Sequence, residues 1–138
     1  MATEPDFDIE ILKPSEGDEF VDAGETPDLE VQLYDNSGST LAKASVKTLV
    51  LNITTEPDSD DEDGSVINSR TNVDVLDANN CTLSASGVAT IRFASEDMAY
   101  QNTEGSEEYH IVQLSWTFDD SESVERLVKK RWKIPVRK

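Results

Sequence analysis

Cysteine and histidine are nearly missing from this sequence, and both shortages narrow the chemistry it can support. Cys81 is the only cysteine, so no disulfide can form within the chain, and His110 is the only histidine. A reactive thiol or a catalytic serine needs a base beside it, and the single imidazole lies in an apolar strand pattern. No phosphate-binding loop or dinucleotide fingerprint occurs. We therefore expect no enzymatic activity, no catalytic residues and no cofactor. We interpret Cys81 as a small core residue and His110 as a packed or interface residue.

Basic residues are scarce as well. The 138 residues include 12 lysines and arginines against 29 aspartates and glutamates, a formal net charge of −17. Attraction to phosphate requires a positive surface, so we expect no direct binding to nucleic acid. Two explanations of the acidity stay open. The protein has an acidic binding surface for a basic partner, or it works in high salt, where screening shortens the range of each charge.

Long apolar runs are absent too. No stretch approaches the roughly 20 apolar residues that a membrane-spanning helix needs, so we expect no membrane association. Met1–Asp8 carries acidic residues where a secretory signal needs an apolar run. A chain of 138 residues is most simply one domain, with enough length for a hydrophobic core. We therefore predict a single domain over residues 1–138.

The clearest pattern that is present lies near the C-terminus, between Glu107 and Val136. Apolar residues alternate with polar ones along Tyr109–Phe118, and a polar, turn-prone link follows at Asp119–Glu122. The alternation then resumes as far as Val136. Strict alternation on both sides of a short polar link predicts a β-hairpin with one apolar face. The apolar face carries His110, Val112, Leu114, Trp116 and Phe118, then Arg126, Val128, Lys130, Trp132, Ile134 and Val136.

Shorter alternating segments occupy the rest of the chain, separated by turn residues at intervals of roughly ten residues. Ser95–Met98 reads as a short helical turn, and no long amphipathic helix is predicted. The pattern predicts an all-β, immunoglobulin-like antiparallel β-sandwich of seven to eight strands, with a closed barrel as the alternative. The predicted strands before the hairpin are Phe7–Ile11, Leu29–Leu33, Val46–Thr54, Val66–Ile67 continued by Val73–Val75 after a turn, Thr82–Leu83 and Ala89–Phe93.

The basic residues are concentrated at one end of the sequence. No acidic residue occurs between Arg126 and Lys138. Two interpretations stay open: these cations neutralise acidic neighbours within their own sheet, or they bind the acidic face of another subunit. We take them as candidate partner-binding residues: Arg126, Lys129, Lys130, Arg131, Lys133, Arg137 and Lys138.

An acidic loop, Glu56–Asp63, is the one stretch that suggests a cation. If Gly64 is aligned with the glycine of a calcium-binding EF-hand loop, Ser59, Asp61 and Asp63 fall at the first three ligand positions. The closing position, which needs a bidentate glutamate, is then Arg70. Because the pattern fails at its ends, we expect a solvated loop and assign no metal ligands.

Two segments carry a resemblance to a known family. One runs from Val66 to Asn80 and holds an Asn-Ser-Arg turn and an Asp-Val-Leu-x-Ala-Asn turn. The other holds the strand Gly87–Phe93, then Asp97, Glu107–His110 and Trp116. Together they resemble small immunoglobulin-like proteins encoded among the head and tail genes of tailed bacteriophages.

The resemblance implies a non-enzymatic structural protein located in the virion in multiple copies. It would decorate the capsid or act as a head–tail accessory subunit, with capsid, portal, neck or tail subunits as its partners. The alternative function is an immunoglobulin-like ligand-binding or adhesion module with a cation site in the acidic loop.

Overall fold

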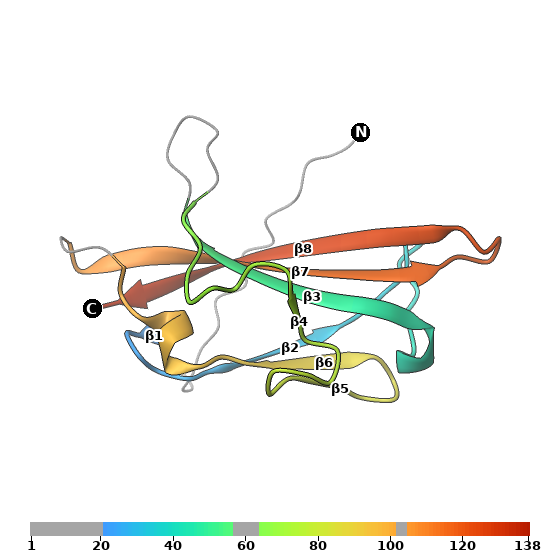
Figure 1. The fold of residues 1–138 in the computed structure, drawn as a ribbon, viewed down its shortest axis with the longest axis horizontal. Helices are drawn as coiled ribbons and strands as arrows, with labels where there is room; N and C mark the ends of the chain where they lie inside the picture. The colour runs from blue at the N-terminus through green and yellow to red at the C-terminus, as the bar shows by residue number, and fades with distance from the viewer. Residues whose placement is uncertain (1–20, 57–63, 102–104) are drawn as a thin grey trace.

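The computed structural model describes residues 21–56, 64–101 and 105–138, and within them the fold is all-β (Figure 1). The predicted first strand, Phe7–Ile11, lies outside the described residues. Two short 3₁₀ helices, Lys43–Ser45 and Ser95–Met98, interrupt the strands, and the second confirms the predicted helical turn. The strands are β1 (Val21–Asp22), β2 (Asp28–Gln32), β3 (Val46–Thr55), β4 (Val73–Asp74), β5 (Thr82–Leu83), β6 (Val88–Arg92), β7 (Glu107–Asp119) and β8 (Glu125–Arg137).

The strands form two sheets that face each other across the core. The larger sheet has the order β1-β8-β7-β3-β4 and the smaller sheet the order β2-β6-β5. In an immunoglobulin sandwich the second, fourth and fifth strands (B, D and E) share one sheet, and strands C, F and G share the other. The observed order fits this arrangement, with β2, β5 and β6 in the first group. The predicted β-sandwich of seven to eight strands is therefore confirmed; only β1, which pairs parallel to β8, departs from antiparallel pairing.

The predicted C-terminal hairpin forms two of the central strands of the larger sheet. β7 and β8 pair over their full lengths, from Glu107↔Arg137 to Asp119↔Glu125. Asp120 closes the turn, since its carboxylate accepts hydrogen bonds from the Glu122 and Val124 amides at 2.8 and 2.9 Å. A two-stranded ribbon of this length is not stable alone in water, so its apolar face needs the second sheet.

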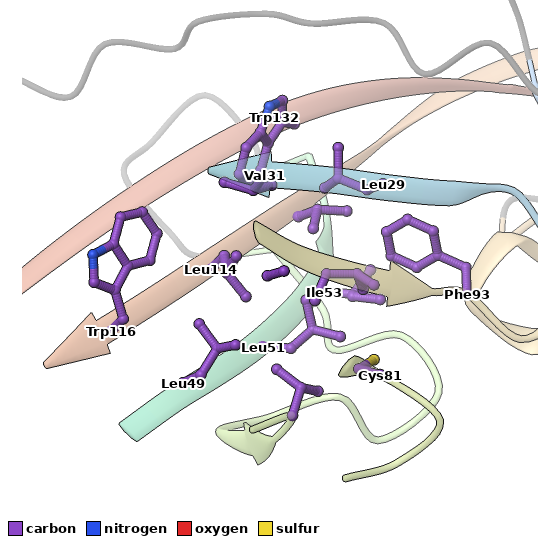
Figure 2. Packing of buried hydrophobic residues seen from close by; sticks show 14 of the residues in the cluster. Leu29, Val31, Leu49, Leu51, Ile53, Cys81, Phe93, Leu114, Trp116 and Trp132 are labelled. Atoms are coloured by element: carbon purple, nitrogen blue, oxygen red, sulfur yellow. The ribbon is translucent and has the colours of Figure 1, made fainter. Parts of the chain in front are cut away.

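The core lies between the sheets and is built from the alternate residues that face inward (Figure 2). Trp116 and Trp132 are both buried, and Leu49, Leu51 and Ile53 of β3 pack on the same side of the larger sheet. The smaller sheet contributes residues such as Leu29 and Val31. Burial of a large apolar side chain stabilises the fold by about 1.5–3 kcal/mol. The apolar face predicted for the hairpin, on β7 and β8, is therefore the inner face.

One predicted strand is wrong in detail. Val66–Ile67 forms only an isolated bridge, Thr54↔Val66, because the chain turns at once. Asn68 and Ser69 both adopt positive φ angles, of 55° and 57°, which a strand does not allow. Ile67 is nevertheless fully buried, whereas Val66 is half exposed.

Candidate interaction surface

The seven basic residues predicted to bind a partner do not form one surface. Because side chains alternate along a strand, β8 sends Arg126 and Lys130 to the core side of the sheet, the side of the buried Trp132. The opposite side carries Lys129, Arg131, Lys133 and Arg137, and Lys138 follows the end of the strand.

The two inward-side cations stabilise their own hairpin. Arg126 Nε lies 2.8 Å from Asp120 Oδ2 in the turn. Lys130 Nζ lies 5.6 Å from the ring centroid of Trp132 and 5.9 Å from that of Tyr34. A cation within about 6 Å of an aromatic face is attracted by the ring quadrupole. These two residues therefore fit the interpretation that the cations serve their own fold.

The outward cations also have neighbours. Lys133 Nζ lies 2.8 Å from Glu56 Oε2 and 4.8 Å from the ring centroid of Tyr109. Arg131 Nε donates to Gln113 Oε1 over 2.6 Å. These contacts involve side chains that solvent reaches, and exposed ion pairs contribute at most about 1 kcal/mol each. They hold the cations in place at little gain in stability.

The outward positions of β8 belong to a larger feature, which we name the outer sheet face. It is the solvent side of the central three strands of the larger sheet, aligned by the registers of β3, β7 and β8. None of the twelve central positions given below carries an acidic side chain, although the chain has a net charge of −17. Glu107, Asp119 and Glu125 lie on the same side at the ends of β7 and β8, and Asp74 of β4 lies beside Val50. The outer sheet face consists of Thr48, Val50, Asn52 and Thr54 of β3, Ile111, Gln113, Ser115 and Thr117 of β7, and Leu127, Lys129, Arg131 and Lys133 of β8.

Acidic residues border the outer sheet face at the hairpin end. Lys47 Nζ bridges Asp119 and Glu125, at 3.2 and 2.9 Å from their carboxylate oxygens. These two hydrogen bonds, the one to Glu125 first, raise the pKa of Lys47 above its ordinary value. Between this cluster and Lys133 the face is uncharged or basic. Its polar side chains bond to one another, as in the 2.6 Å contact between the Thr48 and Thr117 hydroxyls.

A second polar group lies inside the sandwich and centres on Asp97, whose side chain is fully buried. Arg70 donates to both carboxylate oxygens, from Nε over 2.8 Å and from Nη2 over 2.9 Å. Asn68 Nδ2 and the Ala94 amide complete the set, at 2.9 and 2.7 Å. The hydrogen bond to Asp97 raises the pKa of the Arg70 guanidinium. Every acceptor site of this carboxylate is occupied, so Asp97 is a structural anchor for the Asn-Ser-Arg turn.

His110 joins the same buried group. Its Nδ1 lies 3.1 Å from the Asp97 carbonyl oxygen, which can only accept, so Nδ1 carries a proton. Its Nε2 lies 2.6 Å from Glu108 Oε2. The Gln101 amide also donates to Glu108 Oε2, over 2.7 Å. With both ring nitrogens engaged and the ring fully buried, His110 is a packed residue, as the sequence predicted.

Cys81 is a buried free cysteine, also as predicted. Burial raises the pKa of its thiol, which lowers the fraction of reactive thiolate.

The acidic loop lies largely outside the described residues, since residues 57–63 are not among them. Its first residue, Glu56, makes the ion pair with Lys133 described above. Within the described residues, no group of three or more histidine, cysteine, aspartate or glutamate side chains is placed to hold a metal ion. The same residues include no helix that is long and apolar enough to cross a membrane.

Comparison of the chain with protein-family models, with curated proteins and with solved structures gives no match. The resemblance to phage structural proteins thus stays a prediction from the sequence.

Sequence reasoning found the basic half of the outer sheet face and missed the rest. The polar residues of β3 and β7 became part of a surface only through strand pairing, which joins Asn52 to Gln113 and Gln113 to Arg131. One signal was available. Pro135 lies within the last strand, and a proline within a sheet marks an edge strand. The position of β8 close to the edge of the larger sheet was therefore predictable.

Proposed function

We propose that this protein is a non-enzymatic structural subunit of a tailed-phage virion that docks on neighbouring subunits through its outer sheet face. It is present in many copies, as a capsid decoration or head–tail accessory protein. Its partners are capsid, portal, neck or tail subunits, or further copies of itself. The single observation that carries the docking surface is that the twelve central positions of the outer sheet face carry no acidic side chain in a chain with a net charge of −17.

The shape and chemistry of this face suit a protein partner. It is part of a continuous three-stranded surface with paired residues such as Thr48 and Thr117 in register. Apolar side chains lie among the polar ones: Leu127 is 56% exposed. Opposed potentials across an interface speed association and exclude wrong partners, so the basic residues Lys129, Arg131 and Lys133 favour an acidic partner surface. The rest of this chain is itself strongly acidic, so a second copy is one candidate partner.

Sedimentation velocity on the purified protein tests the docking surface. We compare the wild type with K129Q/R131Q/K133Q at low and high salt. The wild type should self-associate at low salt and dissociate as salt rises, because screening weakens the contact between a basic face and an acidic body. The triple variant should remain a monomer throughout.

A matched control removes the same number of positive charges elsewhere. K43Q/K47Q/R92Q changes cations that lie outside the outer sheet face, and it should assemble like the wild type. If wild type, test variant and control sediment alike at every salt, the outer sheet face does not mediate self-association, and this half of the proposal is wrong.

The virion role has its own test. Phage particles purified from the host that carries the gene should contain this chain in a fixed ratio to the major capsid protein, measured by quantitative mass spectrometry. Its absence from the particles removes the virion role and leaves a docking module of another assembly.

A further inference from the structure

The outer sheet face does not supply its own acidic partner. A two-fold contact uses the same patch on both copies, and the twelve central positions of this face carry no carboxylate. At its ends, Lys47 bridges Asp119 and Glu125, and Glu107 lies opposite Arg137 in the register of β7 and β8. A second copy that docks on the basic row of this face therefore has to offer a different surface.

The opposite side of the molecule offers such a surface, which we name the small sheet face. It is the solvent side of β2, β5 and β6, and it points away from the outer sheet face because the two sheets enclose the core between them (Figure 1). Buried and exposed residues alternate along β2, which identifies its solvent side. The small sheet face consists of Asp28, Glu30 and Gln32 of β2, Thr82 of β5, and Val88, Thr90 and Arg92 of β6.

The negative charge of the small sheet face is concentrated on β2. Asp28 and Glu30 are both exposed and lie two residues apart on the same side of the strand. Glu30 lies opposite the uncharged Thr90. Arg92, the one cation of this face, ends β6, and its Nη1 donates to the Asn80 carbonyl over 3.4 Å. The row on β2 therefore presents carboxylates to a partner, as the row on β8 presents cations.

The two charged rows repeat at the same interval. Alternate residues of a strand lie about 6.6–6.8 Å apart on one side, so the spacing of Asp28 and Glu30 matches that of Lys129, Arg131 and Lys133. Two sheets that pack face to face keep their strands within about 30° of each other, at a separation of about 10 Å. In such a stack the carboxylates of β2 in one copy lie beside the cations of β8 in the next.

We propose that this protein associates head to tail, with the outer sheet face of one copy stacked on the small sheet face of the next. The inference rests on the docking surface proposed above and names its partner: a second copy, which presents Asp28 and Glu30. Opposed charges at two places fix both the partner surface and its orientation. A contact between two different surfaces leaves one of each open on every dimer, so assembly continues into a ring if the rotation closes and into a filament if it does not.

Sedimentation velocity of the full chain at low salt tests the head-to-tail order with two variants. K129Q/R131Q/K133Q neutralises the basic row of the outer sheet face, and D28N/E30Q neutralises the acidic row of the small sheet face. Each variant alone should be a monomer at concentrations where the wild type forms species larger than a dimer. An equimolar mixture of the two should form a dimer and nothing larger, because each variant contributes its one intact face.

A matched control removes the same number of carboxylates elsewhere. E96Q/E122Q changes two exposed residues outside both faces and should assemble like the wild type. If D28N/E30Q also assembles like the wild type while K129Q/R131Q/K133Q does not, this inference is overturned and the docking surface itself stands. A mixture of the two test variants that remains monomeric, or that grows beyond a dimer, likewise overturns the head-to-tail order.

Carbodiimide cross-linking of the unmodified protein gives a second measurement that does not depend on the folding of any variant. Isotopically labelled and unlabelled copies are mixed in equal amounts, so that mass spectrometry distinguishes links between copies from links within one copy. Zero-length links between copies should join Asp28 or Glu30 to Lys129 or Lys133. Links between copies that join these lysines only to other carboxylates, such as that of Glu122, overturn the proposal.

Discussion

The buried group around Asp97 and the outer sheet face both join charged side chains, but they differ in how completely each charge is engaged. Inside, the Asp97 carboxylate accepts four hydrogen bonds, from Arg70, Asn68 and the Ala94 amide. Outside, single contacts such as that between Lys133 and Glu56 join side chains that solvent reaches. The buried group therefore serves the fold, whereas the outer cations make contacts that solvent reaches and that contribute little to stability.

The largest expected effect comes from breaking the buried group. Asp97→Ala leaves Arg70 with a charge that is mostly buried and no longer balanced, which typically costs about 3–5 kcal/mol. We expect a loss of this size in the free energy of unfolding, measured by urea denaturation. Asp28→Ala, a truncation at an exposed position, should change it by less than about 0.5 kcal/mol. A loss below about 1 kcal/mol for Asp97→Ala would contradict the difference between the two regions.

The two buried tryptophans give a smaller effect. Trp116 Nε1 donates to the Tyr34 carbonyl over 2.8 Å, whereas Trp132 Nε1 has no acceptor within the described residues. Replacement by phenylalanine removes similar volume at both sites, but only W116F breaks this hydrogen bond. We expect W116F to lower the free energy of unfolding by about 1 kcal/mol more than W132F. If the two variants lose equal free energy of unfolding, the indole hydrogen bond of Trp116 contributes nothing to stability beyond packing.

Removing the outer charges should hardly affect stability. K129Q/R131Q/K133Q should change the free energy of unfolding by less than about 1 kcal/mol, because exposed pairs contribute little. The same variant should lose assembly, so binding and stability separate. A stability loss comparable to that of Asp97→Ala would instead assign these cations to the fold and remove the case for a docking surface.

The smallest effect is expected at the hairpin turn and depends on pH. Hydrogen bonds from the Val124 amide and then from Arg126 hold the pKa of Asp120 below its ordinary value of 3.8. A carboxylate with a depressed pKa stabilises the fold at pH values above the ordinary one, and this stabilisation is lost as the pH falls through the folded-state pKa. Asp120→Asn should therefore make unfolding stability fall less steeply with acid below about pH 4. If the pH dependence of the unfolding free energy is unchanged in this variant, ionisation of Asp120 does not contribute to stability.

Much of the fold was predictable because its signal is local. The period of two along Tyr109–Phe118 and through Trp132 identified the hairpin and its inner face, and turn residues separated the other strands. Val66–Ile67 was misjudged because the left-handed turn at Asn68 and Ser69 depends on Asp97, which lies far along the chain. His110 and Cys81 were read correctly as packed residues, because His110 lies in an apolar strand pattern and Cys81 has no second cysteine to pair with.

The candidate surface was only half predictable. Its basic residues lie close together in sequence, but Arg126 and Lys130 separate from Lys129, Arg131 and Lys133 because a strand sends alternate side chains to opposite sides. The uncharged half, on β3 and β7, has no signal of its own. A row of threonine, asparagine and serine becomes a surface only when the register places it beside β8.

Pro135 also has a consequence for how this protein behaves at high concentration. An uninterrupted edge strand recruits the edges of its neighbours, and sheets then grow from molecule to molecule into aggregates. Pro135 offers no amide to such a neighbour, and Lys129 and Lys133 place charges beside the same edge. These residues at the rim of the larger sheet thus disfavour uncontrolled polymerisation through strand pairing.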